Sequence, residues 1–338
     1  MFYLGLLLPI CYVAGYTGAS IPTQWPFLSF VLVPVLWRSI TMTLLHWLGL
    51  IFIAYVALSI LWSPNRYDSM WGLYITAIAV LSFWLGSSLT TLVPLFRGLA
   101  LGLTISTAVA IIQWFGYFPV AAQGGNLAGL LYNQTVQGAA IALVIVGLVW
   151  LRQWPYIPAL LPGLYLAHSR GGWLILCAGL ISRVHWSLPI ALTAIALAFA
   201  FHNPNADDIL RLQIWSIAWH NLSTIGWGPF ISVYYRDSPT LIHPEFVHDD
   251  YLQLVFEYGF AAIIPITIFA AIVGRSPVLV AFACLATFYF PLHAPVIAFI
   301  GCVVAGHVGR EFSLSQLHLH RSGPNIIPRP YGRQYEAN

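Results

Sequence analysis

The chain has 338 residues, of which 59% are hydrophobic and only 7% are charged, and its formal net charge is +3. A soluble domain typically carries about 25% charged residues, so this composition excludes a water-soluble globule. All of the basic residues are arginine, and their small, scattered excess argues against nucleic acid as a partner. We therefore expect a protein whose solvent is mostly the lipid bilayer.

Apolar runs broken by arginine, proline and glycine follow one another along the chain and predict membrane-spanning helices. A helix that crosses about 30 Å of hydrocarbon needs roughly 20 residues, so the runs at 154–167 and 171–182 are short for a full crossing. The expected fold class is all-α: a polytopic transmembrane helical bundle of roughly 10–12 spans, with one long periplasmic loop that contains an interfacial helix. The candidate spans lie at 1–17, 22–37, 43–62, 69–87, 93–116, 129–151, 154–167, 171–182, 186–201, 250–273, 277–291 and 293–309.

The arginines predict how the chain is oriented. Residues 1–309 form the expected transmembrane domain, which the polar stretch 202–249 interrupts between two spans. With the N-terminus in the cytoplasm, most arginines fall on the inner side, as the positive-inside rule requires. The polar stretch then faces the periplasm. Residues 310–338, rich in proline and glycine, are expected to form a loose cytoplasmic tail.

The polar stretch is expected to carry a helix at the membrane surface. Arg211, Trp215 and Trp219 follow one another at a spacing of four residues and so share one helix face. An arginine with two tryptophans suits a helix that lies in the interface, which we predict from residue 209 to about 222. Most of the acidic residues also lie in this stretch or at the start of the next span, so the polar chemistry gathers on the periplasmic side.

Two arginines on the expected periplasmic side are candidate ligands for an anion. Arg170 precedes Gly171 and Gly172, which allow a close approach of the backbone. Arg211 is the second candidate, because a guanidinium binds phosphate through two hydrogen bonds and stays charged in a low dielectric. The alternatives are a turn arginine that reaches to the lipid headgroups at position 170 and an exposed charge on a surface helix at position 211.

A histidine at the end of the polar stretch is the candidate general base. His248 lies where the chain re-enters the membrane, and an unperturbed imidazole pKa of about 6.5 suits proton transfer. A solvated loop histidine is the alternative, and His243 is a nearby competitor. Asp249 and Tyr251 follow His248 and are expected to support it.

Two further residues are expected to support the site. Ser169 directly precedes Arg170. Asn133 and Gln134 begin an apolar run and are expected to contact a substrate near the outer interface. The alternative for this pair is a polar helix end without contact to substrate.

A metal ion or another cofactor is not expected. Asp207–Asp208 and Asp249–Asp250 offer oxygen ligands for Mg²⁺ or Mn²⁺. Adjacent helical residues point in different directions, however, and no third acid recurs at ligand spacing. The motifs of soluble hydrolases, nucleotide hydrolases and dehydrogenases are also missing from the sequence.

Four segments occur in a fixed order between residues 168 and 260: HSRGGW, RLQIW, GWGPF and HDDYLQLVFEYG. This series resembles the O-antigen ligase/O-antigen polymerase family, which also includes bacterial protein O-oligosaccharyltransferases. The last segment is similar to the family's His-Asn-Xaa-Tyr/Phe-Leu-Gln signature and is the most specific of the four. The rest of the chain matches only as a multi-span apolar protein.

The resemblance implies roles for three residues. Arg170 resembles the family's arginine in its SRG segment, Arg211 the arginine before the loop helix, and His248 the catalytic histidine. Position 249 departs from the pattern, because it holds Asp where Asn is common. This aspartate would either raise the basicity of His248 or mark a different acceptor geometry.

The expected function is transfer of a glycan from an undecaprenyl-diphosphate carrier to an acceptor hydroxyl. The enzyme would be a metal-independent, inverting glycosyltransferase in the bacterial inner membrane, with its active site facing the periplasm and membrane lipids around it. We expect an O-antigen ligase with lipid A–core as acceptor. The alternatives are an O-antigen polymerase, a protein O-oligosaccharyltransferase, a metal-dependent glycosyltransferase and, in a different class, a lipid or solute transporter.

Overall fold

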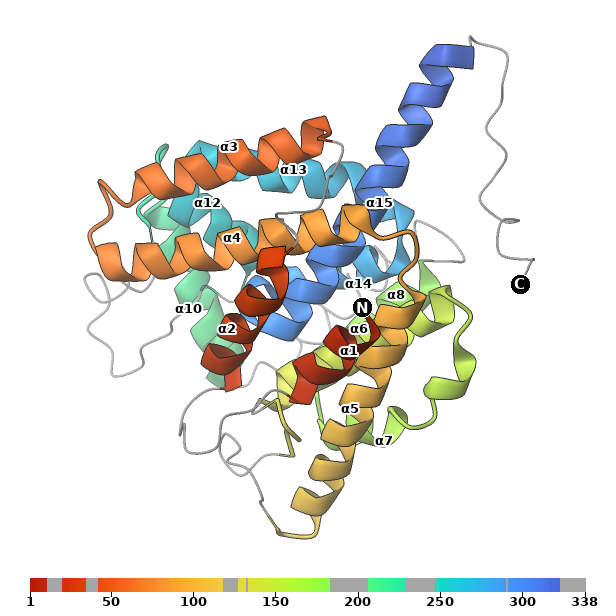
Figure 1. Ribbon diagram of the computed structural model, residues 1–338. Helices are drawn as coiled ribbons and strands as arrows, with labels where there is room; N and C mark the ends of the chain where they lie inside the picture. Colours follow the sequence, from red (N-terminus) through yellow and green to blue (C-terminus); the bar gives the residue numbers. More distant parts are fainter. Residues whose placement is uncertain are drawn as a thin grey trace.

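The structure is a computed structural model that describes residues 1–10, 20–34, 42–117, 127–131, 133–182, 206–228, 247, 249–289 and 291–322. Within these ranges every regular element is a helix, which confirms the all-α fold class for this part of the chain (Figure 1). The elements are α1 (Phe2–Leu7), η1 (Leu8–Ile10), α2 (Ser20–Leu32), α3 (Leu44–Ser59), α4 (Arg66–Ser88), α5 (Val93–Trp114), α6 (Gln134–Trp150), η4 (Trp154–Tyr156), α7 (Leu161–Leu166), α8 (Arg170–Ile181), α10 (Ala206–His220), α12 (Asp250–Tyr258), η5 (Gly259–Ala262), α13 (Ile263–Ile272), η6 (Val273–Arg275), α14 (Pro277–Ala286), η7 (Pro291–His293) and α15 (Pro295–Ser322).

Three helical segments in the described ranges are long and apolar enough to cross a membrane. They are Arg66–Ser88, Val93–Trp114 and Asp250–Arg275, the last of which joins α12, η5, α13 and η6. Shorter apolar helices occur at Leu44–Ser59, Gln134–Trp150, Arg170–Ile181 and Pro277–Ala286. These helices support a membrane protein, while the predicted number of spans stays a prediction.

Two boundaries differ from the sequence-based expectation. The run 154–167 forms only η4 and the six-residue α7, because Pro155, Pro158 and Pro162 each remove a backbone donor and interrupt helical hydrogen bonding. Helix α15 extends to Ser322, so the first part of the expected tail 310–338 is helical. The expected span 186–201 lies outside the described residues.

The core is built around α6. Every residue of this helix from Val136 to Val149 is buried, and α6 packs against α5, α7, α8, α14 and α15. Other helix pairs approach closely through glycine. Gly86 of α4 lies against the backbone of Val303 in α15, and Gly306 of α15 lies against the backbone of Phe83. Small residues let helix backbones come together in this way where lipid removes the hydrophobic drive for association.

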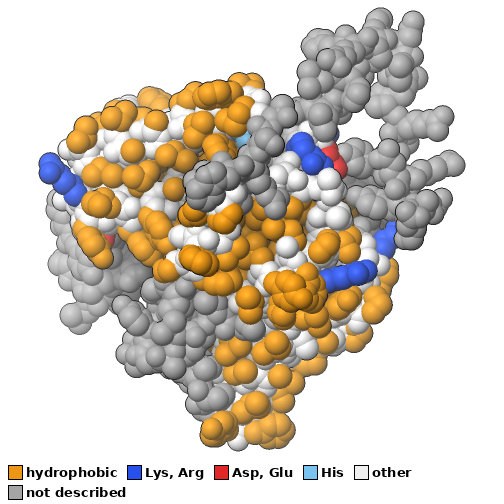
Figure 2. Space-filling model, viewed as in Figure 1, with side chains coloured by type: hydrophobic (Ala, Val, Ile, Leu, Met, Phe, Trp, Pro, Cys, Tyr) orange, Lys and Arg blue, Asp and Glu red, His pale blue; other side chains and the backbone are white. Residues whose placement is uncertain are grey.

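The outer surface of the described helices is largely apolar. Figure 2 shows hydrophobic side chains over most of the described part of one face, with arginines only near its margins. Large exposed side chains include Trp47 of α3, Tyr67 and Trp71 of α4, and Phe115 just after α5. This surface is what a lipid-facing bundle requires and what a water-soluble protein of this size avoids.

Helix α10 corresponds to the predicted interfacial helix, and it packs on α12. Ile214 and Ala218 of α10 are fully buried in one small cluster with Val247 and Phe256. Of the three residues expected on one face, Arg211 and Trp215 are half-buried, whereas Trp219 is exposed. The inward face of α10 thus lies against the segment that begins α12.

Candidate functional site

Helix α12 begins with a capping residue from the predicted site. The Asp249 side chain accepts a hydrogen bond from the Leu252 backbone N–H at 2.9 Å, which satisfies one of the free donors at the helix start. Burial raises the pKa of this carboxyl from its usual value to about 6. The cost of placing a charge away from water thus favours the protonated form of this carboxyl in the folded protein.

The next residue, Asp250, is buried and bonded to a distant part of the chain. One carboxylate oxygen accepts a hydrogen bond from the Leu292 N–H at 2.8 Å, and the other lies 3.4 Å from His293 Nδ1. Only 1% of Asp250 is exposed. A carboxylate in such surroundings persists because it has partners, and these tie the start of α12 to η7.

Two more polar residues of α12 continue the same helix face. Gln253 and Glu257 follow Asp250 at i+3 and i+7, and both are buried. The Gln253 amide donates to Glu257 Oε1 at 2.8 Å and lies 3.4 Å from His293 Nε2. Asp250, Gln253, Glu257 and His293 form one buried polar cluster, which we call the α12 cluster.

The backbone just before the candidate general base is held from two sides. The Val247 N–H donates to Gln253 Oε1 at 3.1 Å, and the Val247 carbonyl accepts from Trp215 Nε1 of α10 at 2.9 Å. His248 itself lies outside the described residues, as does His243. Both neighbours of His248 along the chain are nevertheless fixed, Val247 by these bonds and Asp249 by its cap.

Arg211 lies on α10 at the same junction. Its guanidinium is close enough to the Tyr289 phenol, just beyond α14, to interact with it electrostatically. Tyr289 is buried and precedes the η7 turn that carries His293. Arg211 is therefore a half-buried residue of α10 within electrostatic range of Tyr289, while its role in phosphate binding and the alternative of a charge on a surface helix both stay predictions.

Arg170 begins α8, on a different helix pair. Ser169 caps this helix by accepting from the Gly172 N–H at 3.0 Å, and Ser169 is buried whereas Arg170 is exposed. Figure 1 shows α10 on the left of the bundle and α8 on the right. Convergence of Arg170 and Arg211 on one diphosphate therefore stays a prediction.

The remaining predicted residues have structural partners. The Asn133 side chain caps α6 by accepting from the N–H groups of Thr135 and Val136, which is the helix-end alternative. The Tyr251 hydroxyl donates to the Ala283 carbonyl of α14 at 3.2 Å and so anchors α12. Neither bond excludes a contact with substrate, but each explains the residue without one.

Three of the four segments that carry the family resemblance meet in space. Trp215 in RLQIW bonds to Val247, next to the last segment. The glycine segment pairs with the end of α12 through the Trp227 N–H, which donates to the Phe256 carbonyl at 3.1 Å, and through the Gly228 N–H, which donates to the Glu257 carbonyl at 3.0 Å. The positive φ of Gly228, 76°, suits this turn. The segment HSRGGW lies apart, at α8.

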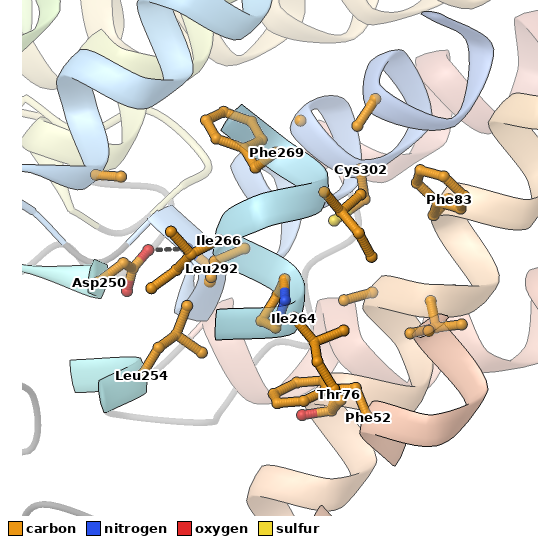
Figure 3. Close-up of a pocket in the computed structure, with 18 of the residues that line it drawn as sticks. Phe52, Thr76, Phe83, Asp250, Leu254, Ile264, Ile266, Phe269, Leu292 and Cys302 are labelled. Carbon is orange, nitrogen blue, oxygen red and sulfur yellow. Dashed lines mark hydrogen bonds between the residues drawn. The ribbon is translucent and has the colours of Figure 1, made fainter. Parts of the chain in front are cut away.

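A cavity of about 210 Å³ adjoins the α12 cluster (Figure 3). Its walls come from α3 and α4 on one side and from α13 and α15 on the other, with apolar side chains such as Phe52, Ile264 and Phe269. The α12 cluster forms its polar end, where Figure 3 shows Asp250 bonded to Leu292. The cavity is thus apolar over most of its surface and acidic at one end.

Sequence reasoning missed the three residues that join Asp250 in this cluster. His293 gave no signal, because it follows Pro291 in a short turn between two apolar runs and has no polar neighbour in sequence. Gln253 and Glu257 did give one, since their spacing from Asp250 places all three on one face of a helix. A polar face on an otherwise apolar span marks residues that need partners inside the protein.

Comparisons with known proteins add no assignment. No protein-family model matches the chain, and no curated protein matches it. Among the described side chains, no group of three or more His, Cys, Asp or Glu residues is arranged to hold a metal ion.

Proposed function

We propose that this protein transfers a glycan from an undecaprenyl-diphosphate carrier to an acceptor hydroxyl at the periplasmic face of a bacterial inner membrane. The observation that carries the proposal is the junction of α10 and α12. There Trp215 and Gln253 hold Val247, and Arg211 lies one helical turn before Trp215 on α10. A half-buried arginine thus lies one helical turn from the tryptophan that bonds to the residue before His248, and this proximity supports a joint role in phosphate binding and base catalysis.

In this scheme the donor brings its own leaving group. The acceptor oxygen attacks the anomeric carbon, the bond from that carbon to the diphosphate breaks, and the electron pair leaves with undecaprenyl diphosphate. His248 takes the proton of the acceptor hydroxyl, and Arg211 stabilises the negative charge that develops on the leaving oxygen. Direct attack inverts the anomeric centre. Arg170 is the proposed second diphosphate ligand.

The ligase, polymerase and protein-glycosylating alternatives differ in the acceptor that they use. We favour an O-antigen ligase, whose acceptor is lipid A–core; a polymerase would use another lipid-linked repeat, and a protein O-oligosaccharyltransferase a protein hydroxyl. In glycolipids from a deletion strain, loss of surface glycan beyond the core indicates a ligase. A core that carries only a single glycan repeat indicates a polymerase.

The test is transfer of a labelled glycan in proteoliposomes. We expect His248→Ala to lower the rate by at least about 100-fold, because general-base catalysis contributes roughly that much. His220→Ala is the matched control, since His220 is exposed on α10 and its ring bonds to the Ser216 carbonyl of its own helix. Undiminished transfer by His248→Ala contradicts the proposal. Loss of transfer in EDTA, restored by Mn²⁺, contradicts its metal-independent form.

The α12 cluster favours a second candidate function. Ionisable groups buried in a membrane bundle often mark a transport path, and Asp250, Glu257 and His293 lie together at a cavity. A lipid or solute transporter would move its substrate across proteoliposomes without bond cleavage. Transport that persists in His248→Ala, with no glycan transfer by the wild type, would support this second function.

A further inference from the structure

The cavity beside the α12 cluster has two chemically distinct parts. Its body is formed by apolar side chains of α3, α4, α13 and α15, among them Phe52, Phe83 and Phe269. Its end is formed by Asp250, Gln253, Glu257 and His293. A site with one apolar part and one polar part fits an amphipathic ligand, with the chain in the body and the head group at the end.

The size of the cavity suits one chain. A dry apolar cavity of roughly 150 Å³ is already large enough to bind benzene. At about 210 Å³, this cavity holds somewhat more, so part of one alkyl or isoprenoid chain fits and several chains side by side do not.

The polar end discriminates against an anionic head group. None of the described residues that line the cavity is an arginine or a lysine, whereas Asp250 and Glu257 are both carboxylic acids. A phosphate placed there would lose its hydration without gaining a cationic partner, and the carboxyl oxygens of the cluster would face its own oxygens. The lipid diphosphate donor is therefore a poor occupant of this cavity, and its phosphates belong with the arginines.

The partners of the two carboxyl groups favour a neutral head group over a cation. Asp250 already accepts the Leu292 N–H and faces His293, and Glu257 already accepts from Gln253. The cluster is locally compensated, so a buried ammonium would lose its hydration for little gain. A hydroxyl group can instead donate to Asp250 Oδ1, a buried acceptor for which the described residues supply no hydrogen-bond donor.

We propose that this cavity binds a single-chain amphiphile with a neutral, hydroxyl-bearing head group, with the chain between α3, α4, α13 and α15 and the hydroxyls at the α12 cluster. The binding site stands on its own geometry. It does not require that the occupant be the glycan acceptor of the proposed function, because a phosphorylated acceptor such as lipid A–core does not fit a polar end without cations.

A cysteine inside the cavity allows a direct test. Cys302 of α15 lines the cavity, and Cys177 of α8 is exposed outside it. Two variants of the full chain, each keeping one of these cysteines and carrying alanine at the other three positions, are reconstituted in neutral lipid. The rate at which a methanethiosulfonate reagent modifies the remaining cysteine is measured in the presence of decyl glucoside, decyl phosphate or decyltrimethylammonium.

We expect decyl glucoside to slow the labelling of Cys302 by about tenfold when its concentration is well above its dissociation constant, because most of the sites are then occupied. The two charged amphiphiles should slow it far less, and Cys177 should be labelled at one rate throughout. Equal protection by the phosphate or stronger protection by the ammonium compound overturns the head-group assignment. Absence of protection by any amphiphile, or a Cys302 that never reacts, overturns the site.

Two variants sharpen the result. A Cβ added at Gly49 would meet only Val80 methyl carbons, at 3.5 and 3.8 Å, so Gly49→Leu extends into the cavity without a backbone clash and should abolish protection by decyl glucoside. Glu257→Gln keeps a partner for Gln253 but removes an acid, and should let decyl phosphate protect Cys302. These readouts measure binding alone, so their failure is distinct from failure of glycan transfer.

Discussion

The starts of α8 and α12 make an instructive pair. Each begins with a polar cap: Ser169 accepts from Gly172, and Asp249 accepts from Leu252. The residue after the cap then differs. Arg170 is exposed, whereas Asp250 is buried and bonded to Leu292, more than forty residues away. A capping side chain satisfies backbone donors of its own helix only. A buried polar residue after the cap also needs partners elsewhere in the chain, and so it fixes the position of its helix relative to distant segments.

The difference extends to how each helix packs. Helix α8 runs parallel to α6, since Gly138 meets Ser169 and Gly172 near one end and Val146 meets Gly179 further along. That contact is made of small residues. Around α12, the contacts with α10 and η7 include hydrogen bonds from Trp215 and Leu292. Stability at α8 therefore depends on close approach, and stability at α12 on polar pairing.

The largest effect on stability is expected at Asp250. Asp250→Ala removes the acceptor of the Leu292 N–H and the partner of His293, and we expect it to lower the free energy of unfolding by about 3 kcal/mol. Asp250→Asn keeps an oxygen for Leu292 and should cost much less. Thermal unfolding in mixed micelles measures both. Equal losses in the two variants would show that the hydrogen bond to Leu292 contributes little.

Arg211 is expected to matter for turnover rather than for folding. Arg211→Ala should lower kcat/KM for glycan transfer by about 100-fold, roughly 2.7 kcal/mol of transition-state stabilisation, while leaving the unfolding temperature nearly unchanged. Arg66→Ala is the matched control, because Arg66 is an exposed arginine at the first position of α4. Equal rates in the two variants would remove Arg211 from the proposed site.

A packing change should act at the contact between α6 and α8. A Cβ at Gly138 would lie 2.5 Å from Ser169 Cβ, so Gly138→Val forces α6 and α8 apart and should lower the free energy of unfolding by about 2 kcal/mol. At Gly171 the nearest atom would be 3.8 Å away, and Gly171→Ala should stay within about 0.5 kcal/mol. A mild Gly138→Val would mean that the two helices are packed less closely than described.

A further prediction concerns pH. Because burial raises the pKa of Asp249 to about 6, the folded protein binds this proton more tightly than the unfolded chain does. That stabilising contribution is complete below the unfolded pKa and is lost as pH rises to about 6. Asp249→Asn keeps a capping oxygen and does not titrate, so we expect its unfolding temperature to fall less between pH 4 and pH 6. Parallel pH profiles would contradict the raised pKa.

The sequence predicted the helical class and several local features for physical reasons that act over short distances. Arg211, Trp215 and Trp219 at helical spacing indicated α10, and the apolar run at 250–273 indicated the segment that begins with α12. The break at Gly259 escaped prediction, because the apolar run continues through it while the backbone adopts a positive φ of 55°. The pairing of Asp250 with Leu292 escaped it too, since a single sequence holds no sign of which distant turn will meet a buried carboxylate.

The central claim is that Arg211 and His248 serve one donor site, and chemical modification of His248 tests it most directly. Diethyl pyrocarbonate labelling is followed by mass spectrometry in proteoliposomes, with and without undecaprenyl diphosphate. We predict that the lipid diphosphate slows modification of His248 in the wild type but not in Arg211→Ala, and leaves His220 unchanged in both. Modification of His248 at one rate whether or not the lipid diphosphate is present would contradict a shared site.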